Sequence, residues 1–599
     1  MRFAELTTVY NELEATTKRL EMRKILSGLV QRVARSELAE VLYLSQGLLR
    51  PEYERVELGV ADSLARRALA GVTGTEEEKI RQLTLESGDL GLTAERLFAG
   101  RAPPAEVDSR TVAEVYAQLR AIAESAGEGS QERKVLLLSS LLECANATEA
   151  KYLLRFVLGT LRLGVREMTL LDALADAYAG GTKEGRRRIE AAFNVSSDLG
   201  IVAEALVDHG LDGMDSIRIS VGRPVRPMLA ERSPDLKDLL ERMDGTSVLE
   251  YKYDGLRIQA HLPAEGPPQL FSRRLEPISE QFPELLRELP RAIRHRPAIV
   301  EGECVSVDPD SGELRPFQAI SRRRGRKYDL AKAEEEIPVR LFLFDVLLEG
   351  ATERMKEDYP ERRRRLEALV RPDGSERVAL ATQQRVTELG AATQFFDQAI
   401  ADGCEGVIGK SVAPDSVYRA GARGFWWIKY KREYTQALAD TIDGVIVGAF
   451  AGRGRRAGTW GALLVAVYDP ENDRFESFCK VGSGFDDETL AGLKARLRPL
   501  ETAERPAEVL TELTPDQWFR PSIVIELRGA ELSLSPIHRA AFGKLRAGVG
   551  LALRFPRFTG RWREDKKETD ATTSAELLGL YRSQVRQESS SPADEAPAS

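Results

Sequence analysis

The sequence EYKYDGLR, residues 250–257, brings together side chains that could do covalent chemistry. If this stretch is a strand, its alternation places Glu250, Lys252 and Asp254 on one face and two tyrosines on the other. A strand at a solvated sheet edge would show the same pattern, since charged side chains usually face water. Alternatively, Lys252 is a nucleophile, which requires a pKa lowered from its reference value of about 10.4. The octapeptide by itself leaves both interpretations open.

Other kinds of catalysis find little support in the sequence. The four cysteines lie too far apart for a zinc site or a disulfide framework, and none of the four histidines lies near a serine or cysteine in a nucleophile-like setting. The segment GCEGVIGKS, residues 403–411, resembles a phosphate-binding loop. Its first glycine is one residue too early, however, and Val407 and Ile408 favour a strand. We therefore expect any chemistry to depend on lysine, arginine and carboxylates.

A lysine amine that attacks a nucleotide α-phosphate would form a lysine–AMP phosphoramidate. The reaction needs cations around the phosphates, carboxylates for Mg²⁺ and an aromatic side chain against the base. The chain offers further lysines at a suitable spacing, since WIKYK, residues 427–431, places Lys429 and Lys431 on one face of a strand.

The overall composition indicates a multidomain protein without a membrane segment. A chain of 599 residues predicts three or four domains, and 42% hydrophobic with 30% charged residues is an ordinary globular balance. We find no run of eighteen apolar residues and no signal-peptide core, so we expect a cytoplasmic protein. The net charge of −8 argues against a protein that coats nucleic acid over its whole surface. Basic clusters at 321–327, 361–365, 452–456 and 554–567 are, taken singly, more often solvated faces.

The pattern of expected secondary structure changes along the chain and predicts three domains. Residues 1–220 show helical spacing, 221–434 mix strands with helices, and 435–585 contain strand candidates at 441–450, 461–469, 474–485, 522–529 and 549–556. Five strands in such a length suit a small barrel of the OB type. Residues 221–234, with three prolines, are interpreted as a linker, and the polar tail 586–599 is expected to be disordered.

EYKYDGLR resembles the K-x-D-G-x-R signature of the covalent nucleotidyltransferases, which are the polynucleotide ligases and the mRNA capping enzymes. The further motifs of that family have counterparts in the same order. Any one of them alone could be a surface acid or a core aromatic, but seven in sequence leave little room for chance. The six that follow are FSRR (271–274), VEGE (300–303), LFLFD (341–345), CEGVIGK (404–410), WWIKYK (426–431) and RFPRFTGRWREDK (554–566).

The resemblance implies a role for each motif. Lys252 would carry AMP, Glu250 and Phe344 would hold the adenine, and Glu303 and Glu405 would organise Mg²⁺ or, in its place, Mn²⁺. Asp254 would serve the later joining steps. The residues implied to contact the nucleotide phosphates or the leaving pyrophosphate are Arg257, Arg273, Arg423, Lys429, Lys431, Arg563, Asp565 and Lys566. One departure is Gly409, where a bulkier residue is common in the family.

The first 220 residues are similar to the helical DNA-binding domain of ATP-dependent DNA ligases of the archaeal and eukaryotic replicative type. The segments LRLGVREMTLLDALADAYAG, GRPVRPMLAER and SPIH are also similar to that type, and the resemblance covers residues 1–580. It implies an all-α DNA-binding domain, an α+β adenylation domain and a β-barrel OB-fold domain. It further implies a monomer that seals 5′-phosphate/3′-hydroxyl nicks in double-stranded DNA with ATP, in replication, repair or recombination.

Several alternatives stay open at this point. A capping-type guanylyltransferase or an RNA ligase shares the lysine motif but has no reason for the helical domain, and a non-catalytic DNA clamp would carry the motif as a vestige. An NAD-dependent ligase is disfavoured because the chain lacks a four-cysteine cluster. A sliding clamp is a further candidate partner. The segment LTAERLFAG, residues 92–100, lies roughly where related enzymes carry a clamp-binding loop, but it lacks the usual paired aromatics.

Overall fold

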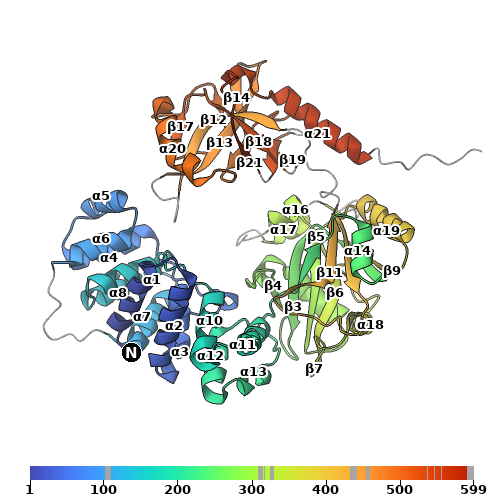
Figure 1. Cartoon of the computed structure of the whole chain (residues 1–599), viewed down its shortest axis with the longest axis horizontal. Coiled ribbons are helices and arrows are strands. Elements are labelled where there is room, and N and C mark those ends of the chain that lie inside the picture. Colours follow the sequence, from blue (N-terminus) through green and yellow to red (C-terminus); the bar gives the residue numbers. More distant parts are fainter. Residues whose placement is uncertain are drawn as a thin grey trace, which may run out of the picture. The chain divides into compact units, whose positions relative to one another are not determined.

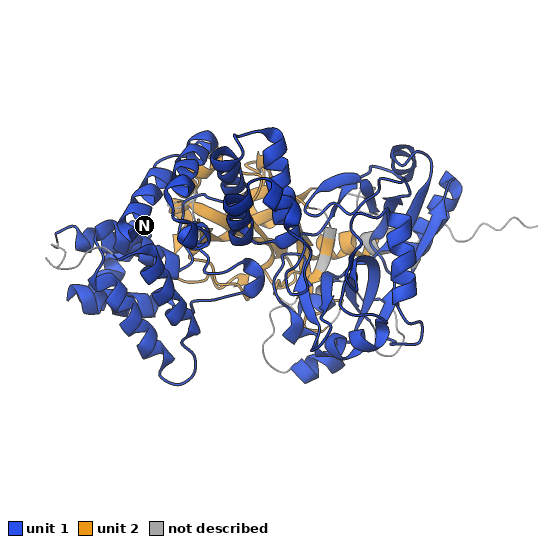
Figure 2. Cartoon of the chain, turned by 90° about the horizontal axis from the view of Figure 1, so that it is seen from below, with its two compact units in different colours: residues 1–431 blue, residues 432–599 orange. Residues whose placement is uncertain are grey.

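The computed structural model describes residues 1–100, 110–307, 314–315, 317–323, 330–431, 441–452, 459–529, 531–535, 537–545, 547–554 and 556–589. The chain forms two compact units, Met1–Lys431 and Arg432–Ser599, which are coloured separately in Figure 2. Figure 1 labels their helices and strands.

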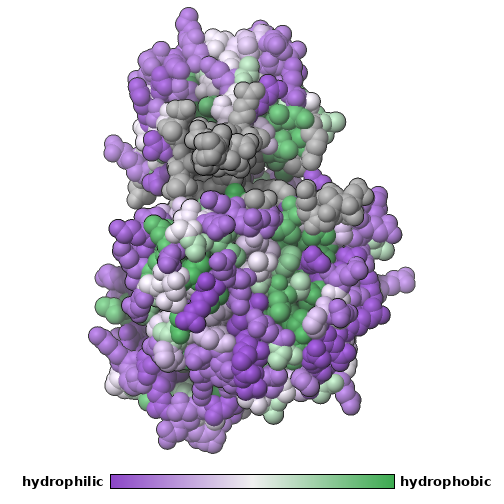
Figure 3. Space-filling model, turned by 90° about the vertical axis from the view of Figure 1, so that its right-hand side faces the viewer, coloured by the Kyte–Doolittle hydropathy of each residue, from purple (hydrophilic) through white to green (hydrophobic). Residues whose placement is uncertain are grey.

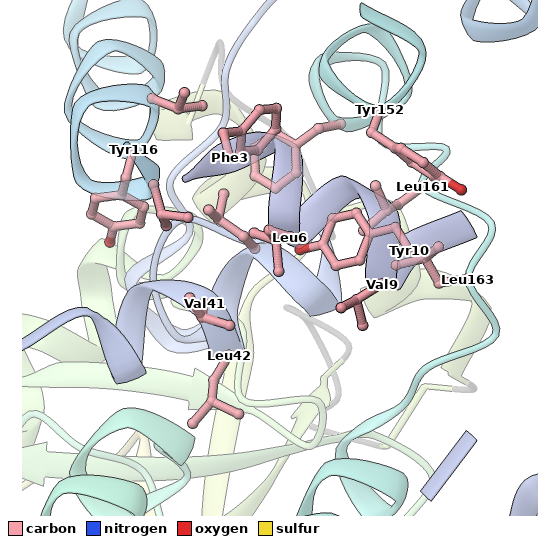
Figure 4. Close-up of a cluster of buried hydrophobic side chains, with 14 of the residues drawn as sticks. Phe3, Leu6, Val9, Tyr10, Val41, Leu42, Tyr116, Tyr152, Leu161 and Leu163 are labelled. Carbon is pink, nitrogen blue, oxygen red and sulfur yellow. The ribbon is translucent and has the colours of Figure 1, made fainter. Parts of the chain in front are cut away.

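The first part of unit 1 consists of helices, as the spacing of its apolar residues predicts. In the first helix, Phe3, Leu6, Tyr10 and Leu13 recur at intervals of three and four residues, so they share one face and are buried. Figure 4 shows this cluster, to which α3 contributes Val41. The helices are α1 (Phe3–Glu14), α2 (Arg19–Arg32), α3 (Leu38–Gln46), α4 (Asp62–Thr73), α5 (Glu77–Ser87), α6 (Leu90–Phe98), α7 (Val112–Glu124), α8 (Ser130–Glu143), α9 (Ala147–Val157), α10 (Glu167–Tyr178), α11 (Lys183–Ser196), α12 (Leu199–His209) and α13 (Asp212–Ser216).

The candidate clamp-binding segment at 92–100 lies mostly in α6. Asp89 caps this helix by accepting hydrogen bonds from the N–H groups of Gly91 and Leu92. Ala94 and Phe98 are buried in the helical core. A docking segment needs exposed apolar side chains, so these two residues give a clamp interaction no support.

The rest of unit 1 contains two β-sheets with helices on their outer faces (Figure 1). One sheet has the strand order β1-β11-β10-β2-β9. The other has the order β4-β3-β5-β6-β7, with β8 beside β6. Helices α14 and α19 pack on the first sheet, and α15 and α18 on the second. The strands are β1 (Leu229–Arg232), β2 (Ser247–Lys252), β3 (Leu256–Leu262), β4 (Gln269–Ser272), β5 (Ala298–Ser306), β6 (Val339–Glu349), β7 (Thr352–Glu353), β8 (Val378–Leu380), β9 (Gln383–Val386), β10 (Gly406–Ser411) and β11 (Arg423–Lys431), and the helices are α14 (Leu236–Arg242), α15 (Pro283–Ala292), α16 (Phe317–Ser321), α17 (Leu330–Glu336), α18 (Tyr359–Leu369) and α19 (Leu389–Ala401).

Two predictions from the sequence fall in this region, one on the segment 221–234 and one on the segment 403–411. The proline-containing segment 221–234 is not a free linker, because it contains strand β1, which pairs in parallel with β11. Val225 and Met228 in the same segment are fully buried. The rejection of a phosphate-binding loop at 403–411 is confirmed, because residues Gly406–Ser411 form strand β10.

Unit 2 is built on antiparallel strands, and each predicted strand segment contains a strand. The sheet order is β15-β17-β12-β13-β14-β16, and β18 joins β12 to β21. Sequence patterning did not predict β21 or the shorter strands. The elements are β12 (Ile442–Ala451), β13 (Trp460–Asp469), β14 (Arg474–Val481), α20 (Asp487–Leu497), β15 (Glu501–Thr502), β16 (Val509–Leu510), β17 (Gln517–Phe519), β18 (Val524–Arg528), β19 (Glu531–Ser535), β20 (Gly550–Arg554), β21 (Arg557–Trp562) and α21 (Ser574–Ser589).

The C-terminal tail differs from its prediction at its start. Helix α21 continues through Ser589, so disorder from residue 586 is wrong for the first four residues of the tail. Residues 590–599, on which the rest of that prediction falls, lie outside the described part of the chain. In the regions that the structure describes, none of the helices has both the length and the apolar character that a membrane span requires. Hydrophilic side chains also cover most of the face drawn in Figure 3.

Candidate functional site

The octapeptide lies in the interior of a sheet rather than at its solvated edge. Strand β2 pairs with β10 on one side and with β9 on the other, and Glu250 is only 2% exposed. The tyrosines face away from the charged residues, since Tyr251 packs against Phe395 of α19. A buried row of charged side chains is costly unless it is paired or used, so the interpretation of the pattern as a solvated face is wrong.

The register of three neighbouring strands gathers the charged side chains into rows. Gly406 of β10 lies opposite Lys252 of β2 and opposite Lys431 of β11. Two residues further along, Glu250 and Lys429 share the next row, on the same face of the sheet. A Cβ at Gly406 would come within 2.2 Å of the carbonyl oxygen of residue 430, so only glycine fits between the two lysine-bearing strands.

The turn after β2 also depends on a glycine. A Cβ at Gly255 would lie 2.3 Å from the carbonyl oxygen of Cys304 on β5, so a side chain there would push the turn away from that strand. The close approach brings β3 alongside β5, where Arg257 lies opposite Glu303. Two of the predicted site residues are thereby placed on the sheet that faces Lys252.

Lys252 forms an ion pair with a residue of the fourth motif. Its Nζ lies 2.5 Å from Oε2 of Glu405, and Nζ of Lys431 lies 2.5 Å from the same oxygen. Burial would lower the pKa of Lys252, but the charges of Glu405 and Glu303 outweigh burial and hold this pKa above its ordinary value. The lysine is therefore an ammonium in this state, held in place by the carboxylate that bridges it to Lys431.

Two further carboxyl groups, those of Asp254 and Glu303, lie near this pair, and the pKa values of the three carboxyl groups differ. Burial and the neighbouring Glu405 raise the pKa of Asp254 to about 6, and burial raises the pKa of Glu303 to about 7. The pKa of Glu405 falls to about 2 despite its burial, because Lys252 lies beside it and Asp254 donates a hydrogen bond to it. Asp254 is held from the other side by the N–H of Phe317, at 3.0 Å. Burial disfavours the charged forms of Asp254 and Glu303, and a bound divalent cation would stabilise those forms.

Lys429 provides a second cationic centre. Burial, followed by the charges of Lys252, Lys431, Arg232 and Arg273, lowers the pKa of Lys429 to about 8. A cluster of positive charges that lowers the pKa of its own member is suited to a polyphosphate. Arg423, in contrast, is exposed at the first residue of β11, at the end of the strand away from Lys431. The structure does not bring Arg423 to the other cations.

A buried pocket of aromatic rings lies beside Glu250, and its cation was not among the predicted site residues. Nζ of Lys410 lies 2.7 Å from Oε1 of Glu250, and neither side chain is more than 3% exposed. The same ammonium lies 4.7–4.9 Å from the ring centroids of Phe344, Trp427 and Tyr359. Phe344 meets Trp427 edge to face, with a centroid distance of 6.0 Å. The predicted partners for adenine, Glu250 and Phe344, therefore share one pocket, which Lys410 holds together.

Arg257 occupies the other side of Phe344. Its guanidinium lies 5.3 Å from the Phe344 centroid and 5.5 Å from that of Trp427. It pairs with Glu301, whose Oε2 accepts a hydrogen bond from Nη2 at 2.8 Å and another from the hydroxyl of Tyr418, also at 2.8 Å. Arg257, which is predicted to contact phosphate, is thus already paired with the carboxylate of Glu301. Sequence reasoning did not identify this partner.

The C-terminal motif forms a separate cluster inside unit 2. Nη1 of Arg563 and Nζ of Lys566 lie 2.6 and 2.8 Å from Oδ2 of Asp443. Arg563 also pairs with Asp565 through two hydrogen bonds, which lower the pKa of that carboxyl to about 2. Asp443, at the start of β12, is 7% exposed. Sequence reasoning missed it because it lies 120 residues before Arg563.

Sequence reasoning did not identify Lys410, although this lysine is the last residue of the motif CEGVIGK. It follows Gly406 and Ile408 at intervals of two, so alternation would have placed it on the same face of β10 as the rows of Lys252 and Glu250. Asp443 gave no comparable signal, since an acid at the start of an apolar strand is common.

Family models match most of the chain. The model described as "DNA ligase N terminus" matches residues 2–175, "ATP dependent DNA ligase domain" matches 227–431, and "ATP dependent DNA ligase C terminal region" matches 456–566. The chain is 47% identical to "DNA ligase 2" of Thermofilum pendens, with 98% of each chain covered. It is 45% identical to a "DNA ligase" of Pyrobaculum calidifontis, with 98% of this chain and 99% of that one covered.

The chain therefore belongs to the ATP-dependent DNA ligase family. Its architecture is accordingly multidomain, with an N-terminal helical region, an adenylation region and an OB-like C-terminal region. A solved structure titled "Pmar-Lig_PreS3" has a similar fold, with a TM-score of 0.52 and 17% identity over 93% of this chain and 99% of that one.

Proposed function

We propose that this protein seals nicks between a 3′-hydroxyl and a 5′-phosphate in duplex DNA, with ATP as the source of AMP. The observation that carries the proposal is the pair of rows on β2, β10 and β11, in which Lys252 and Lys431 share Glu405 and Glu250 lies two residues away. The names of the relatives, all DNA ligases, support the same conclusion. As a DNA-joining enzyme it would work as a monomer at the nucleoid in the cytoplasm.

In the first step, the Lys252 ammonium gives up a proton to solvent, and the neutral amine at Nζ attacks the α-phosphorus of ATP and loses a second proton to solvent. The N–P bond forms as the bond from the α-phosphorus to the bridging oxygen breaks, and pyrophosphate leaves. Glu250 and Phe344 hold the base, while Lys429 and Lys431 bind phosphate oxygens. Lys431 is released for this purpose when the substrate takes the place of its partner Glu405. Arg257 and Arg273 are proposed to complete the phosphate contacts.

A divalent cation fits the carboxylates of this site. Among the described residues, no group of three or more Asp, Glu, His or Cys side chains is arranged to hold a metal ion by itself. Mg²⁺ is ordinarily held by one or two carboxylates together with substrate phosphates, which suits Glu303 and Glu405. When bound there, Mg²⁺ or Mn²⁺ would neutralise the carboxylate charge that raises the pKa of Lys252 and would stabilise the negative charge on the leaving pyrophosphate.

In the second step, AMP passes from Lys252 to the 5′-phosphate of the nick, and in the third the 3′-hydroxyl attacks that phosphate and releases AMP. Asp254, whose pKa of about 6 lets it exchange a proton near neutrality, is assigned to these later steps. Arg563, Asp565 and Lys566 are assigned to the pyrophosphate of the first step. The domains that carry this work are proposed as 1–220, 221–434 and 435–585, the last an OB barrel.

The test is to incubate the full chain with ATP labelled at the α-phosphate, and then with nicked DNA. We expect the protein to gain an acid-labile label that maps to Lys252 and to lose it when nicked DNA is added. Sealing should require ATP when ATP, GTP or NAD is the sole nucleotide. Lys252→Ala should abolish labelling, while Lys237→Ala, an exposed lysine of α14, should leave it unchanged. Labelling from GTP alone, or labelling that survives Lys252→Ala, would overturn the proposal.

A further inference from the structure

Strand β3 carries a buried row of three polar side chains, of which the proposed chemistry uses only the first. Arg257, Gln259 and His261 alternate along the strand and therefore share one face. Gln259 is 4% exposed and His261 is completely buried. Buried polar groups persist when their hydrogen bonds are satisfied, so the partners of this row indicate what the row holds.

The row is bonded to the backbone of one segment, residues 222–228. The N–H of Gly222 donates to Nδ1 of His261 at 3.0 Å. Val225 is bonded twice to Gln259, through its N–H to Oε1 at 2.7 Å and through its carbonyl to Nε2 at 3.1 Å. The carbonyl of Met228 accepts a hydrogen bond from Nη1 of Arg257 at 2.7 Å.

The side chains of the row are also bonded to one another. Because Nδ1 of His261 accepts a hydrogen bond from a backbone N–H, the ring proton lies on Nε2, which donates to Oε1 of Gln259 at 2.8 Å. Nε2 of Gln259 then donates to Oε1 of Glu301 at 3.3 Å, and Glu301 pairs with Arg257. A continuous hydrogen-bonded chain thus runs from His261 to the arginine that flanks Phe344.

The opposite side of the same segment is fastened to the helical region. The hydroxyl of Ser197 donates to the carbonyl of Pro224 at 2.6 Å, and the N–H of Arg226 donates to the carbonyl of Asn194 at 2.8 Å. The guanidinium of Arg226 pairs with Glu167 of α10 and lies 4.4 Å from the ring centroid of a phenylalanine of α11. Segment 222–228 therefore lies between two regions and is bonded to both.

We propose that Gln259 and His261 are positioning residues that hold Arg257 in the nucleotide pocket, and that segment 222–228 couples this arginine to the helical region. The inference rests on the proposed function, in which Arg257 contacts the nucleotide. Without the amide of Gln259, Glu301 loses a donor and Val225 loses both partners. The guanidinium of Arg257 is then free to leave its place beside Phe344. Misplacement of a catalytic contact by about 1 Å can cost about a hundredfold in rate.

A purely structural role for the row would lower stability without acting through Arg257, and a double-mutant cycle separates the two roles. The measured quantity is the single-turnover rate at which ATP adenylates Lys252 in the full chain. We expect Gln259→Leu to lower this rate about tenfold and Arg257→Ala about a hundredfold. The double variant should match Arg257→Ala within about twofold, because the arginine that Gln259 positions is already absent.

Two further variants make the cycle decisive if Gln259→Leu folds poorly. Gln259→Glu keeps the acceptor for the N–H of Val225 and for His261 but loses the donor to Glu301 and to the carbonyl of Val225, so it should slow adenylation non-additively as well. Arg226→Ala, which loosens the segment from the helical region, should slow adenylation by a smaller factor that disappears in the Arg257→Ala background. Ile258→Val, on the opposite face of β3 in the hydrophobic core, is the control that lowers the melting temperature without slowing adenylation.

The inference would be overturned if the effects of the Gln259 and Arg257 variants on the adenylation rate multiply. An Arg226→Ala effect on that rate that persists without Arg257 would overturn it as well. A wild-type chain that takes up no label from ATP would instead contradict the proposed function. The two failures are therefore distinguishable in one experiment.

Discussion

Replacement of Lys410 by methionine tests how the adenine pocket is held together. The ammonium lies 2.7 Å from Glu250 and within 5 Å of three aromatic centroids, in a site closed to water. Burial lowers the pKa of Lys410 and raises that of Glu250, so each charge is maintained mainly by the other. Methionine keeps the length and apolar contacts of the side chain but removes the charge.

The expected loss follows from the charge that is left behind. Removal of one partner from a buried ion pair typically costs about 3–5 kcal/mol. Here Arg363 remains 3.6 Å from Glu250, and the carboxyl can take up a proton, so we expect a value near the lower limit, about 3 kcal/mol at pH 8. Glu250→Gln in the same chain removes the uncompensated charge, and the double variant should lie within about 1 kcal/mol of the wild type.

The loss of stability caused by Lys410→Met should depend on pH. Loss of Lys410 raises the pKa of Glu250 further above its value in the unfolded chain. A group whose folded pKa is raised gains stability as the pH falls, so the deficit of Lys410→Met should shrink between pH 8 and pH 6. The assay is the free energy of unfolding from urea titrations of the wild type, both single variants and the double variant. A single variant as stable as the wild type at pH 8, or a double variant no better than Lys410→Met, would refute the reasoning.

Three further predictions concern other parts of the site. The raised pKa of Glu303, about 7 against an ordinary 4.5, contributes stability that is present at low pH and lost as the pH rises through 7; in urea titrations the wild type should gain on the order of 1 kcal/mol relative to Glu303→Gln from pH 8 to pH 6. Asp443→Asn removes the carboxylate that holds Arg563 and Lys566, and should slow adenylation of Lys252 about tenfold while leaving the sealing of a pre-adenylated nick unchanged; an equal fall in both single-turnover rates would contradict the assignment. Binding of nicked duplexes, followed by fluorescence anisotropy, should weaken steeply with salt and should not depend on the sequence around the nick.

The sequence predicts the rows of the site well because strand alternation and register are local properties. Once β2, β10 and β11 are recognised as neighbours, period two places Glu250 and Lys252 on one face of the sheet. Lys429 and Lys431 lie in the same two rows and on the same face, on the far side of β10. The family resemblance supplies the order of the motifs, but pairing of the strands is what converts that order into one pocket. Gly406 then follows as a steric requirement of that pairing.

Partners that depend on tertiary packing could not be predicted in the same way. Arg423 shares a strand with Lys429 and was grouped with it, yet six residues of extended chain place it at the far end of β11. Glu301 is two residues before Glu303 in the same motif, and a role was assigned from the sequence only to Glu303. The structure shows Glu301 buried on Arg257 while Glu303 faces Lys252, a difference that follows from which sheet each carboxylate meets.

The prolines of segment 221–234 misled the sequence interpretation for a physical reason. Proline lacks a donor and interrupts regular pairing, so such a stretch is usually assigned to a linker. Backbone groups of Gly222, Val225 and Met228 are satisfied by side chains instead, at His261, Gln259 and Arg257. Hydrogen bonds from buried side chains hold the backbone of residues 222–228 in place, as pairing with a neighbouring strand would, although these residues lack the alternating sequence pattern of a strand. The alternation of polar residues along β3 was the available signal, because a buried Gln and His require partners that a neighbouring strand could not supply.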